Sequence, residues 1–555
     1  MSTGIKQLVL DIETNSAHNM IWLCVTQDVE TEEVVCHTDP STLAPLVKEY
    51  DQIIGHNIIG FDAPVLRRHW NIGIPKSKAV DTLILSRLLN PQLDGGHSLK
   101  AYGLRLGNEK IEFDFEDFDS GLTDEMRTYC IQDVKLTRDL YLWLMSEFSK
   151  WKNSSQSILL EHDIAVICRQ QELNGFKLDV PKAQVLRAEM SDRMATIEDD
   201  VQAVFPPIVE ERWSEKTGKQ LKDKVTVFNL ASRKQIADRL ISLGWKPEKH
   251  TEKGQPIVDE GTLEDIDIPQ AQLIAEYLML QKRVGMIDSW LKHVDENTSR
   301  VHGGIITNGA VTGRMTHRSP NMGQIPSVNK PYGERIRSLW TVDDGNVLVG
   351  TDLSGIELRC LAHYMQDDEW TEELLNGDIH QKNADAAGIT RPQSKTLIYA
   401  TLYGAGPAKI GSIVGGGAKE GQEILHRFYR NTPALSRLME KVKNLAAKGY
   451  VPGLDGRRIL VRSEHAALNS LLQGCGAIIA KQWCVEAHQT LRRQGIPVKQ
   501  VAFVHDEIQT ETEERYGEQV ASIMVDSAKQ AGTTLGFRCP VDAEAKIGNN
   551  WFDTH

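Results

Sequence analysis

The stretch at residues 500–511, QVAFVHDEIQTE, sets two carboxylates, Asp506 and Glu507, between two short apolar runs. Two such runs separated by two polar residues are typical of a β-hairpin. We therefore expect residues 501–504 and 507–511 to pair as strands, with His505 and Asp506 at their turn. A carboxylate pair buried without a counter-charge would cost several kcal/mol of stability. The stretch thus predicts a positive group close to this turn.

A second apolar run carries a carboxylate to a similar position. Residues 347–364, VLVGTDLSGIELRCLAHY, predict a buried strand that ends at Asp352 and a helix that follows it. By spacing alone, Ser354 and Glu357 predict a capping box at the start of that helix. Asp352 and Asp506 could together flank a pair of Mg²⁺ ions, and those ions would supply the positive charge that the hairpin requires.

Between these two segments, residues 391–406, RPQSKTLIYATLYGAG, predict a helix with Pro392 in its first turn and Gly404 at its end. Two cations and then two aromatic residues recur on one face at intervals of four: Arg391, Lys395, Tyr399 and Tyr403. A solvated amphipathic helix has the same spacing. However, cations followed by aromatic rings are also what binding a triphosphate and stacking on a base would require.

A further group of acids comes from three segments near the N-terminus. In residues 8–15, LVLDIETN, a strand delivers Asp11 and Glu13 to one face, because side chains alternate along a strand. Residues 56–66, HNIIGFDAPVL, offer Asn57 and Asp62.

The third segment, residues 129–137, YCIQDVKLT, places Tyr129 and Asp133 four apart on one face of a helix. Each pattern is common alone, but all three in order are much rarer. Four acids from three segments could hold two divalent ions, which activate a water and stabilise a leaving oxygen in phosphodiester hydrolysis. Tyr129 could orient that water.

Composition sets limits on these interpretations. A chain of 555 residues exceeds what one core usually holds, so we expect several domains. The net charge of −13 argues weakly against a nucleic-acid partner unless basic residues gather locally. The eight cysteines lack a CxxC or metal-ligand spacing and fit a reducing cytoplasm. No signal peptide and no apolar run of roughly 18 residues occur, so we expect a cytoplasmic protein without a membrane partner.

The order of patterns along the chain indicates its organisation. Residues 1–150 alternate strand-like and helix-like runs and predict a small α/β domain. Long amphipathic helices fill residues 155–295, interrupted by EERWSEKTGKQLKDKV at 210–225, which predicts a solvated loop. Strands and helices alternate again from about residue 300 to the C-terminus.

Together these segments resemble family A DNA polymerases, and among them the short phage-type enzymes related to the T7 replicative polymerase. Motif A is DLSGIELR at 352–359, motif B is the helix at 391–406, and motif C is VHDE at 504–507. Similar segments lie at 308–327, 376–384, 453–477 and 548–555. The N-terminal acids resemble the DEDDy type of 3′-5′ proofreading exonuclease through DxE, Asn-x3-Phe-Asp and Tyr-x3-Asp.

The resemblance implies an α/β multidomain fold, with an RNase H-like 3′-5′ exonuclease domain followed by a right-hand polymerase domain. The exonuclease domain would cover residues 1–150 and the thumb 151–300. The palm would cover 301–365 and 446–555, and the fingers 366–445. The implied activity is that of a DNA-directed DNA polymerase with proofreading, whose substrates are primer-template DNA and dNTPs. The enzyme would serve the DNA replication of a phage.

The resemblance also implies the metal sites, each with two Mg²⁺ ions, for which Mn²⁺ could substitute. In the polymerase site the ligands would be Asp352, Asp506 and the Leu353 carbonyl, with Glu507 as a secondary catalytic carboxylate. In the exonuclease site the resemblance assigns four metal ligands and one water-positioning residue: Asp11, Glu13, Asp62 and Asp133, with Tyr129.

Nucleotide and DNA contacts follow from the same motifs. Glu357 resembles the steric gate against a ribose 2′-hydroxyl, and Tyr399 the residue against the incoming sugar. The implied triphosphate ligands are His380, Arg391 and Lys395. Arg314 and Gln473 match positions that reach the minor groove of the new base pair, where acceptors occur in every correct pair. The other implied DNA contacts are Tyr403 as the base-stacking platform, His505 at the primer end, and Asn321, Gln324 and Asn469 on the backbone.

The sequence departs from the family pattern in two places. Ala400 follows Tyr399 where many relatives have glycine, which bears on fingers closure. Residues 205–228 are too short for the thumb insertion by which the T7-type enzyme recruits thioredoxin, so thioredoxin is not expected as a partner. A helicase–primase and a single-strand-binding protein are the candidate protein partners.

Three other functions fit parts of the sequence. A nuclease with a DNA-binding C-terminal region would not need Asp352 and Asp506. A single-subunit RNA polymerase shares the Tyr-Gly end of the helix at 391–406, but Glu357 and the exonuclease residues argue against it. A non-enzymatic replisome scaffold would tolerate loss of ligands, and here none is missing. The polymerase interpretation accounts for the most residues.

Overall fold

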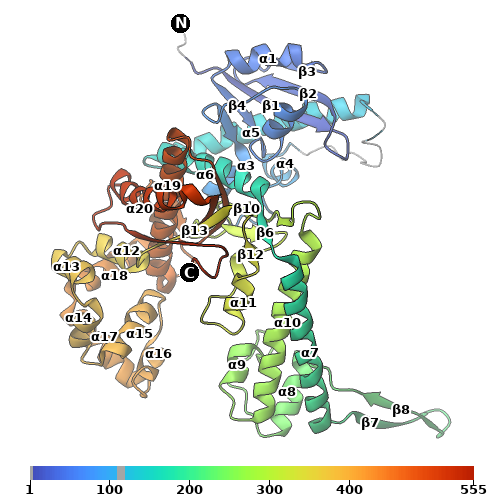
Figure 1. The fold of residues 1–555 in the computed structure, drawn as a ribbon, viewed down its shortest axis with the longest axis vertical. Helices are drawn as coiled ribbons and strands as arrows, with labels where there is room; N and C mark the ends of the chain where they lie inside the picture. The colour runs from blue at the N-terminus through green and yellow to red at the C-terminus, as the bar shows by residue number, and fades with distance from the viewer. Residues whose placement is uncertain (1–3, 109–118, 120) are drawn as a thin grey trace. The chain divides into compact units, whose positions relative to one another are not determined.

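The computed structural model describes residues 4–108, 119 and 121–555. Its chain forms two compact units (Figure 1). The first holds the residues up to Gly175, Gly303–Gln324 and Val342–His555, and the second holds Phe176–His302 and Ile325–Thr341.

The first unit begins with a mixed sheet of strand order β3-β2-β1-β4-β5. These strands are β1 (Gln7–Thr14), β2 (Ile21–Asp28), β3 (Val34–His37), β4 (Gln52–Gly55) and β5 (Ala79–Asp81). Side chains of β1 alternate between the two faces, so Val9 joins the core against α5 (Asp124–Phe148), while Leu8 and Leu10 join the opposite core. That second core includes residues of α1 (Pro40–Glu49) and α2 (Asp62–His69). The sheet is therefore covered by helices on both faces, as α3 (Thr82–Leu89) and α4 (Leu99–Leu106) also pack on the α5 side.

After α6 (Ser154–Asn174), a second sheet has the strand order β16-β17-β13-β18. Its strands are β13 (Asn346–Leu353), β16 (Val498–Val504), β17 (Glu507–Glu513) and β18 (Ala543–Gly548), all paired antiparallel. The predicted hairpin is confirmed, because β16 ends at Val504 and β17 begins at Glu507. One core joins this sheet to α12 (Ile356–Met365), α19 (Ala467–Arg493) and α20 (Gly517–Thr534).

Smaller elements complete this part of the unit. Two short ribbons pair β10 (Gly304–Ile306) with β11 (Thr316–Arg318), and β14 (Tyr450–Pro452) with β15 (Arg458–Leu460). Between α12 and β14 the α-helices are α13 (Asp368–Asn376), α14 (Ile379–Ala387), α15 (Arg391–Leu402), α16 (Pro407–Ser412), α17 (Ala418–Asn431) and α18 (Pro433–Ala446). The helix predicted at 391–406 is therefore α15, with Pro392 in its first turn and Gly404 just beyond its end at a φ of +73°.

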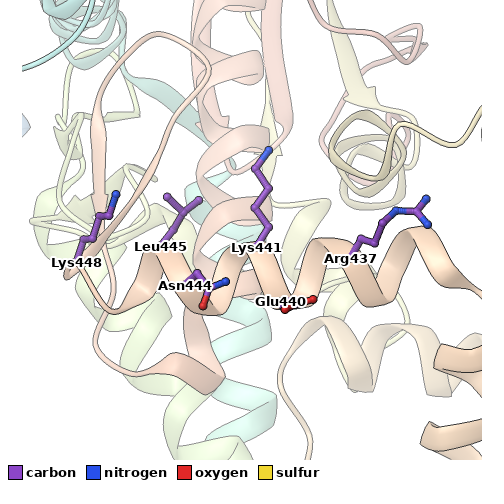
Figure 2. Close-up of a pocket in the computed structure, with 6 residues that line it drawn as sticks. All are labelled: Arg437, Glu440, Lys441, Asn444, Leu445 and Lys448. Carbon is purple, nitrogen blue, oxygen red and sulfur yellow. The ribbon is translucent and has the colours of Figure 1, made fainter.

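Helix α18 is amphipathic: Leu435, Leu438 and Val442 are buried in the common core. Its outer face borders a shallow groove of 410 Å³ (Figure 2). The lining residues are Arg437, Glu440, Lys441, Asn444, Leu445 and Lys448. None of these six is a predicted site residue.

The second unit is built on two long helices, α7 (Val180–Val204) and α10 (Pro269–His293) (Figure 1). They are antiparallel, because Arg187 pairs with Asp288 while Arg193, further along α7, pairs with Glu276 earlier in α10. Short helices α8 (Arg233–Ser242), α9 (Glu260–Glu264) and α11 (Gly333–Arg337) belong to the same unit. A small sheet joins β6 (Phe176–Leu178) to β9 (Arg300–Val301) and β12 (Trp340–Thr341).

The prediction of a solvated loop at residues 210–225 is wrong. The segment forms a β-hairpin of β7 (Ile208–Trp213) and β8 (Gln220–Thr226). Every side chain of β7 is exposed, and Lys224 pairs with Glu210 across the strands at 3.1 Å. Because neither face of β7 is buried, its sequence lacks the apolar–polar alternation that marks a half-buried strand.

Phe176 begins the second unit, whereas α6 belongs to the first, so the proposed thumb boundary at residue 151 stays a prediction. All eight cysteines are free thiols. Among the described residues, no helix combines the length and the apolar character that a membrane crossing requires.

Candidate active sites

The first carboxylate site lies at the end of β1 against α5. Asp11 and Glu13 present their oxygens to the Cys130 sulfur of α5, and one ligand atom from each residue lies within 4.8 Å of the others. The Cys130 thiol donates to Oδ2 of Asp11 at 3.6 Å, and burial raises its pKa well above the usual value. This thiol is therefore a hydrogen-bond donor to Asp11. The predicted common face of Asp11 and Glu13 is confirmed.

The other acids of this group are buried nearby. Asp62 begins α2 with 2% of its surface exposed, and its Oδ1 has no hydrogen-bond partner. Burial and then the negative charge of Asp11 raise the pKa of Asp62 well above its ordinary value. Tyr129 and Asp133 lie one turn apart on α5 as predicted, and both are buried.

A fifth buried acid, Asp81, was not singled out from the sequence. Its carboxylate accepts backbone N–H groups of Asn57 at 2.9 Å and Ile59 at 3.1 Å, so it fixes the turn that precedes Asp62. It also accepts the N–H of Leu83 at 3.0 Å as the N-cap of α3. The sequence signal was an Asp-Thr pair between a short apolar strand and a helix, which is a common N-cap pattern.

The second carboxylate site lies where β13 meets the β16–β17 turn. Asp352 is the penultimate residue of β13 and stands opposite Glu507 in the antiparallel register. The next residue, Leu353, donates its N–H to the Asp506 carbonyl at 3.0 Å. The hairpin therefore brings Asp506 beside the end of β13, as the sequence predicted. His505 takes a φ of +60° at this turn.

The two neighbouring acids of the hairpin have different environments. Burial raises the pKa of Asp506, while Arg314 and His505 oppose that rise through their positive charge. Glu507 is buried, and its Oε1 accepts from Gln509 Nε2 at 2.7 Å and from the Trp551 indole. The positive group that the sequence required near Asp506 thus includes Arg314.

The predicted capping box at Ser354 and Glu357 is wrong. The N-cap of α12 is Gly355, which has no side chain to cap with. The Glu357 carboxylate instead accepts a 2.9 Å hydrogen bond from the Tyr403 hydroxyl and lies 3.7 Å from Nη2 of Arg314. Long-range partners displaced the local one, and they tie motif A to the end of α15.

The exposed end of α15 carries the predicted cations. Arg391 is exposed and pairs with Asp378 at 2.6 Å, which raises the pKa of the Arg391 guanidinium. Lys395 is exposed one turn later. His380 lies on α14, where burial and the charges of Arg391 and Lys395 lower its pKa. Arg391 and Lys395 therefore lie close enough to His380 for their charges to disfavour its protonation.

Four of the predicted DNA contacts lie on α19 and on a short 3₁₀ turn. Asn469 and Gln473 occupy successive turns of α19 and are half-buried. Asn321 and Gln324 are exposed at a short 3₁₀ turn, where Asn321 Oδ1 accepts the N–H of Gly323 at 2.9 Å. Tyr399 is half-buried on α15, and burial followed by the charge of Glu357 raises its pKa.

Comparison with known families decides the classification. The sequence profile described as DNA polymerase family A matches residues 209–553, more than half of the chain. The chain belongs to DNA polymerase family A. The resemblance inferred from motifs A, B and C is thereby confirmed.

Phage relatives of this family A polymerase are similar over nearly its whole length. The DNA-directed DNA polymerase of Escherichia phage T7 is 32% identical, and the alignment covers 99% of this chain and 100% of the relative. That of Enterobacteria phage T3 is 33% identical over 92% of this chain and 93% of the relative. The T7 alignment runs over 708 positions, so the relative carries segments that this 555-residue chain lacks.

A solved structure supports the fold. The POL domain of Pol1 from M. smegmatis, in complex with DNA primer-template and dNTP, superposes with a TM-score of 0.80 at 19% identity. The match covers 98% of this chain and 95% of that one. The expected fold class, an RNase H-like domain followed by a right-hand polymerase domain, is confirmed.

The residues present in this family A polymerase fit divalent cations. Hard cations such as Mg²⁺ prefer carboxylate and carbonyl oxygens. At the first site, Asp62 Oδ1 is buried without a hydrogen-bond donor, and Asp11 and Glu13 converge from β1. A buried carboxylate oxygen without a donor is costly unless a cation compensates it. At the second site, Asp352 and Asp506 stand at adjoining strand ends.

Proposed function

We propose that the chain is a template-directed DNA polymerase that also proofreads with a 3′-5′ exonuclease, and that it replicates a phage genome. One observation carries the polymerase assignment. The β13–β17 pairing brings Asp352 and Asp506 together, beside Arg314, Glu357 and Tyr403. Metal ligands, a sugar filter and a base platform would then share one site.

In this proposal Asp352, Asp506 and the Leu353 carbonyl hold two Mg²⁺ ions, for which Mn²⁺ can substitute. Bound cations of this kind stabilise the entering oxygen and the leaving pyrophosphate in nucleotidyl transfer. Arg391, Lys395 and His380 bind the triphosphate of the dNTP, which is consistent with the closeness of the two cations to His380. Glu507 stays secondary because its Oε1 already accepts two side-chain donors.

Substrate selection then falls to the residues between motif A and α15. Glu357, held by Tyr403, excludes a ribose 2′-hydroxyl, and Tyr399 lies against the incoming sugar. Arg314 and Gln473 donate to minor-groove acceptors of the new pair, which occur in every correct pair. His505 contacts the primer end. Asn321, Gln324 and Asn469 contact the DNA backbone.

The exonuclease assignment rests on the first carboxylate site. Asp11, Glu13, Asp62 and Asp133 hold the cations, and Tyr129 orients the attacking water. Shape discrimination alone is limited to a few kcal/mol, so a separate hydrolytic site is the expected means of correcting errors. The substrate is a single-stranded 3′ end. Action in the host cytoplasm, and work with a helicase–primase and a single-strand-binding protein, belong to the same proposal.

The test is a gel assay of a 5′-labelled primer on a longer template with Mg²⁺, with and without the four dNTPs. We expect extension with dNTPs and shortening without them. Asp352→Asn should lose extension alone, and Asp62→Asn should lose shortening alone. If the unmodified chain shortens the primer under both conditions, the polymerase assignment fails and a nuclease takes its place.

A further inference from the structure

A buried cluster of four charged residues lies outside both carboxylate sites. Arg457, in the turn between β14 and β15, pairs with Asp455 at 2.6 Å and with Glu161 of α6 at 2.7 Å. Lys481 of α19 reaches the same Glu161 oxygen at 2.6 Å. All four side chains are at most 3% exposed. The cluster therefore joins α6, α19 and the β14–β15 turn.

The turn that carries Arg457 is packed against backbone on two further sides. A Cβ at Gly456 would lie 2.5 Å from the Lys152 carbonyl oxygen, so the turn lies directly against the start of α6. A Cβ at Gly313 would lie 3.1 Å from Nη1 of Arg457. The guanidinium of Arg457 therefore supports the backbone beside Arg314.

The loop at residues 310–314, which includes Gly313 and Arg314, also packs against α19. A Cβ at Gly474 would lie 3.2 Å from the Thr312 carbonyl oxygen. Within the loop, the Ala310 N–H donates to the Arg314 carbonyl at 3.1 Å, and Gly313 takes a φ of +78° that only glycine adopts readily. Gly474 immediately follows Gln473. Arg314 lies two residues after Thr312. The two proposed minor-groove donors, Arg314 and Gln473, therefore lie on either side of the contact between Thr312 and Gly474.

We propose that Arg457 is a positioning residue for minor-groove recognition: its two-sided ion pairing holds the loop of Arg314 against the α19 turn of Gln473. The inference rests on the proposed function, in which these two side chains donate to the new base pair. Arg457 touches neither DNA nor nucleotide in this scheme. It acts by fixing the spacing of the two donors.

The chemistry of Arg457 suits this role better than that of a lysine. A guanidinium presents five N–H donors in a rigid plane, so it can engage Asp455 and Glu161 at once in fixed directions. A lysine keeps the charge but has no such plane. Arg457→Lys should therefore keep the buried charge balance while loosening the support beneath Gly313.

The experiment measures how strongly primer extension depends on the minor-groove acceptor. The incoming purine nucleotide is either the natural dNTP or its 3-deaza analogue, which lacks the N3 acceptor, and the two single-nucleotide incorporation rates give a natural-to-deaza ratio. For the unmodified polymerase we expect a ratio of about ten or more. Arg314→Ala should bring it close to one, and Arg457→Lys should lower it at least about threefold. A merely structural role would slow incorporation of both nucleotides equally and leave the ratio unchanged.

Two further variants define the outcome. Arg458→Lys is the matched control, because the neighbouring Arg458 is outside the cluster and donates to the Lys150 carbonyl at 2.7 Å; it should keep the full ratio. Arg314→Ala combined with Arg457→Lys should match Arg314→Ala alone within about twofold, because residues that act through one another are not additive. If Arg457→Lys fails to fold, Glu161→Gln removes one side of the support and should lower the ratio in the same direction.

Failure of this inference is distinct from failure of the proposed function. If the unmodified chain extends no primer, the polymerase proposal itself fails. If it extends primers and Arg314→Ala lowers the ratio, but soluble Arg457→Lys and Glu161→Gln both retain it, only the positioning role is overturned. A ratio of one in the unmodified polymerase also overturns the inference, while primer extension would still support the function.

Discussion

The Tyr403 hydroxyl donates a 2.9 Å hydrogen bond to Oε1 of Glu357, and this contact joins the end of α15 to motif A. Glu357 also lies 3.7 Å from the Arg314 guanidinium. Three proposed roles therefore meet at one carboxylate: the sugar filter, the base platform and a minor-groove donor. These two contacts orient the Glu357 side chain, which lies in the first turn of α12.

Truncating this side chain should relax sugar selection. Glu357→Ala removes the carboxylate that would face a 2′-hydroxyl, so we expect the kcat/KM ratio of dATP to ATP to fall by at least about tenfold. Single-nucleotide extension with each substrate measures this ratio. Glu369→Ala, at an exposed carboxylate of α13, should leave it unchanged. An unaltered ratio in Glu357→Ala would remove Glu357 from the sugar filter.

Divalent cations should stabilise the N-terminal domain through Asp62. A ligand that binds only the folded state raises stability by RT ln(1 + [L]/Kd). We expect the thermal unfolding midpoint to rise when Mg²⁺ or Mn²⁺ replaces EDTA, and the rise to shrink in Asp62→Asn. In EDTA, Asp62→Asn should itself be the more stable chain, by about 1 kcal/mol, because it removes a buried charge whose Oδ1 lacks a donor. A cation-induced rise that survives in Asp62→Asn would count against this carboxylate as a ligand.

The contrast between predicted and unpredicted features has a physical basis. Strand alternation and short spacings located the hairpin at Asp506, the Asp11–Glu13 face and the α15 face, because those patterns depend on neighbours along the chain. The Ser354–Glu357 capping box failed because Tyr403 and Arg314, distant in sequence, compete for Glu357. Local patterns cannot reveal such competition.

Local sequence patterns also failed to predict the buried charged cluster at Glu161. Glu161 lies in a stretch predicted as an amphipathic helix, whose charges are expected to face water, yet it is fully buried between Arg457 and Lys481. Its partners are about three hundred residues away in the chain, so no spacing rule connects them. The roles carried over from family motifs are a different case, since they depend on resemblance and stay predictions until each residue is tested.

The contact between α16 and α17 should tolerate no added methyl group. A Cβ at Gly421 would overlap the Pro407 carbonyl oxygen, and backbone cannot rotate away as a side chain can. Overpacking of this kind costs about 1–3 kcal/mol, so Gly421→Ala should lower the thermal unfolding midpoint. Gly406→Ala is the matched control: its Cβ meets nothing within 4 Å and its φ is −73°, so the midpoint should hold. Equal midpoints for both variants would refute the close packing.

The β7–β8 hairpin should be dispensable for folding. Every residue of β7 is exposed, and Ile208 and Thr226 are directly paired, so a short Gly-Ser turn can replace 208–226. We expect the thermal midpoint to change by less than about 2 °C. Phe228 just beyond the hairpin is buried with its ring 5.2 Å from Phe205, so Phe228→Ala should destabilise the same unit clearly. A large loss on excision would mean that the hairpin packs on part of the fold.

Stability should fall on acidification through His363. Burial, and then the charge of Arg538, lower the pKa of His363 from 6.5 to about 4 in the folded chain, where its Nδ1 accepts the Arg538 N–H at 3.0 Å and its ring stacks on Phe537. The unfolded chain therefore binds a proton at His363 more readily than the folded chain does. The contribution of neutral His363 to the free energy of unfolding is complete above pH 6.5 and is lost as the pH falls toward 4. His363→Asn keeps an acceptor near the Nδ1 position but does not titrate, so its thermal midpoint should fall less between pH 7.5 and 5 than that of the unmodified chain.

His426→Asn, at an exposed position of α17, is the control for this prediction, and its thermal midpoint should follow that of the unmodified chain. Parallel curves for His363→Asn and the unmodified chain would show that other groups cause the acid sensitivity, since the proton uptake at His363 is the one difference that this substitution removes.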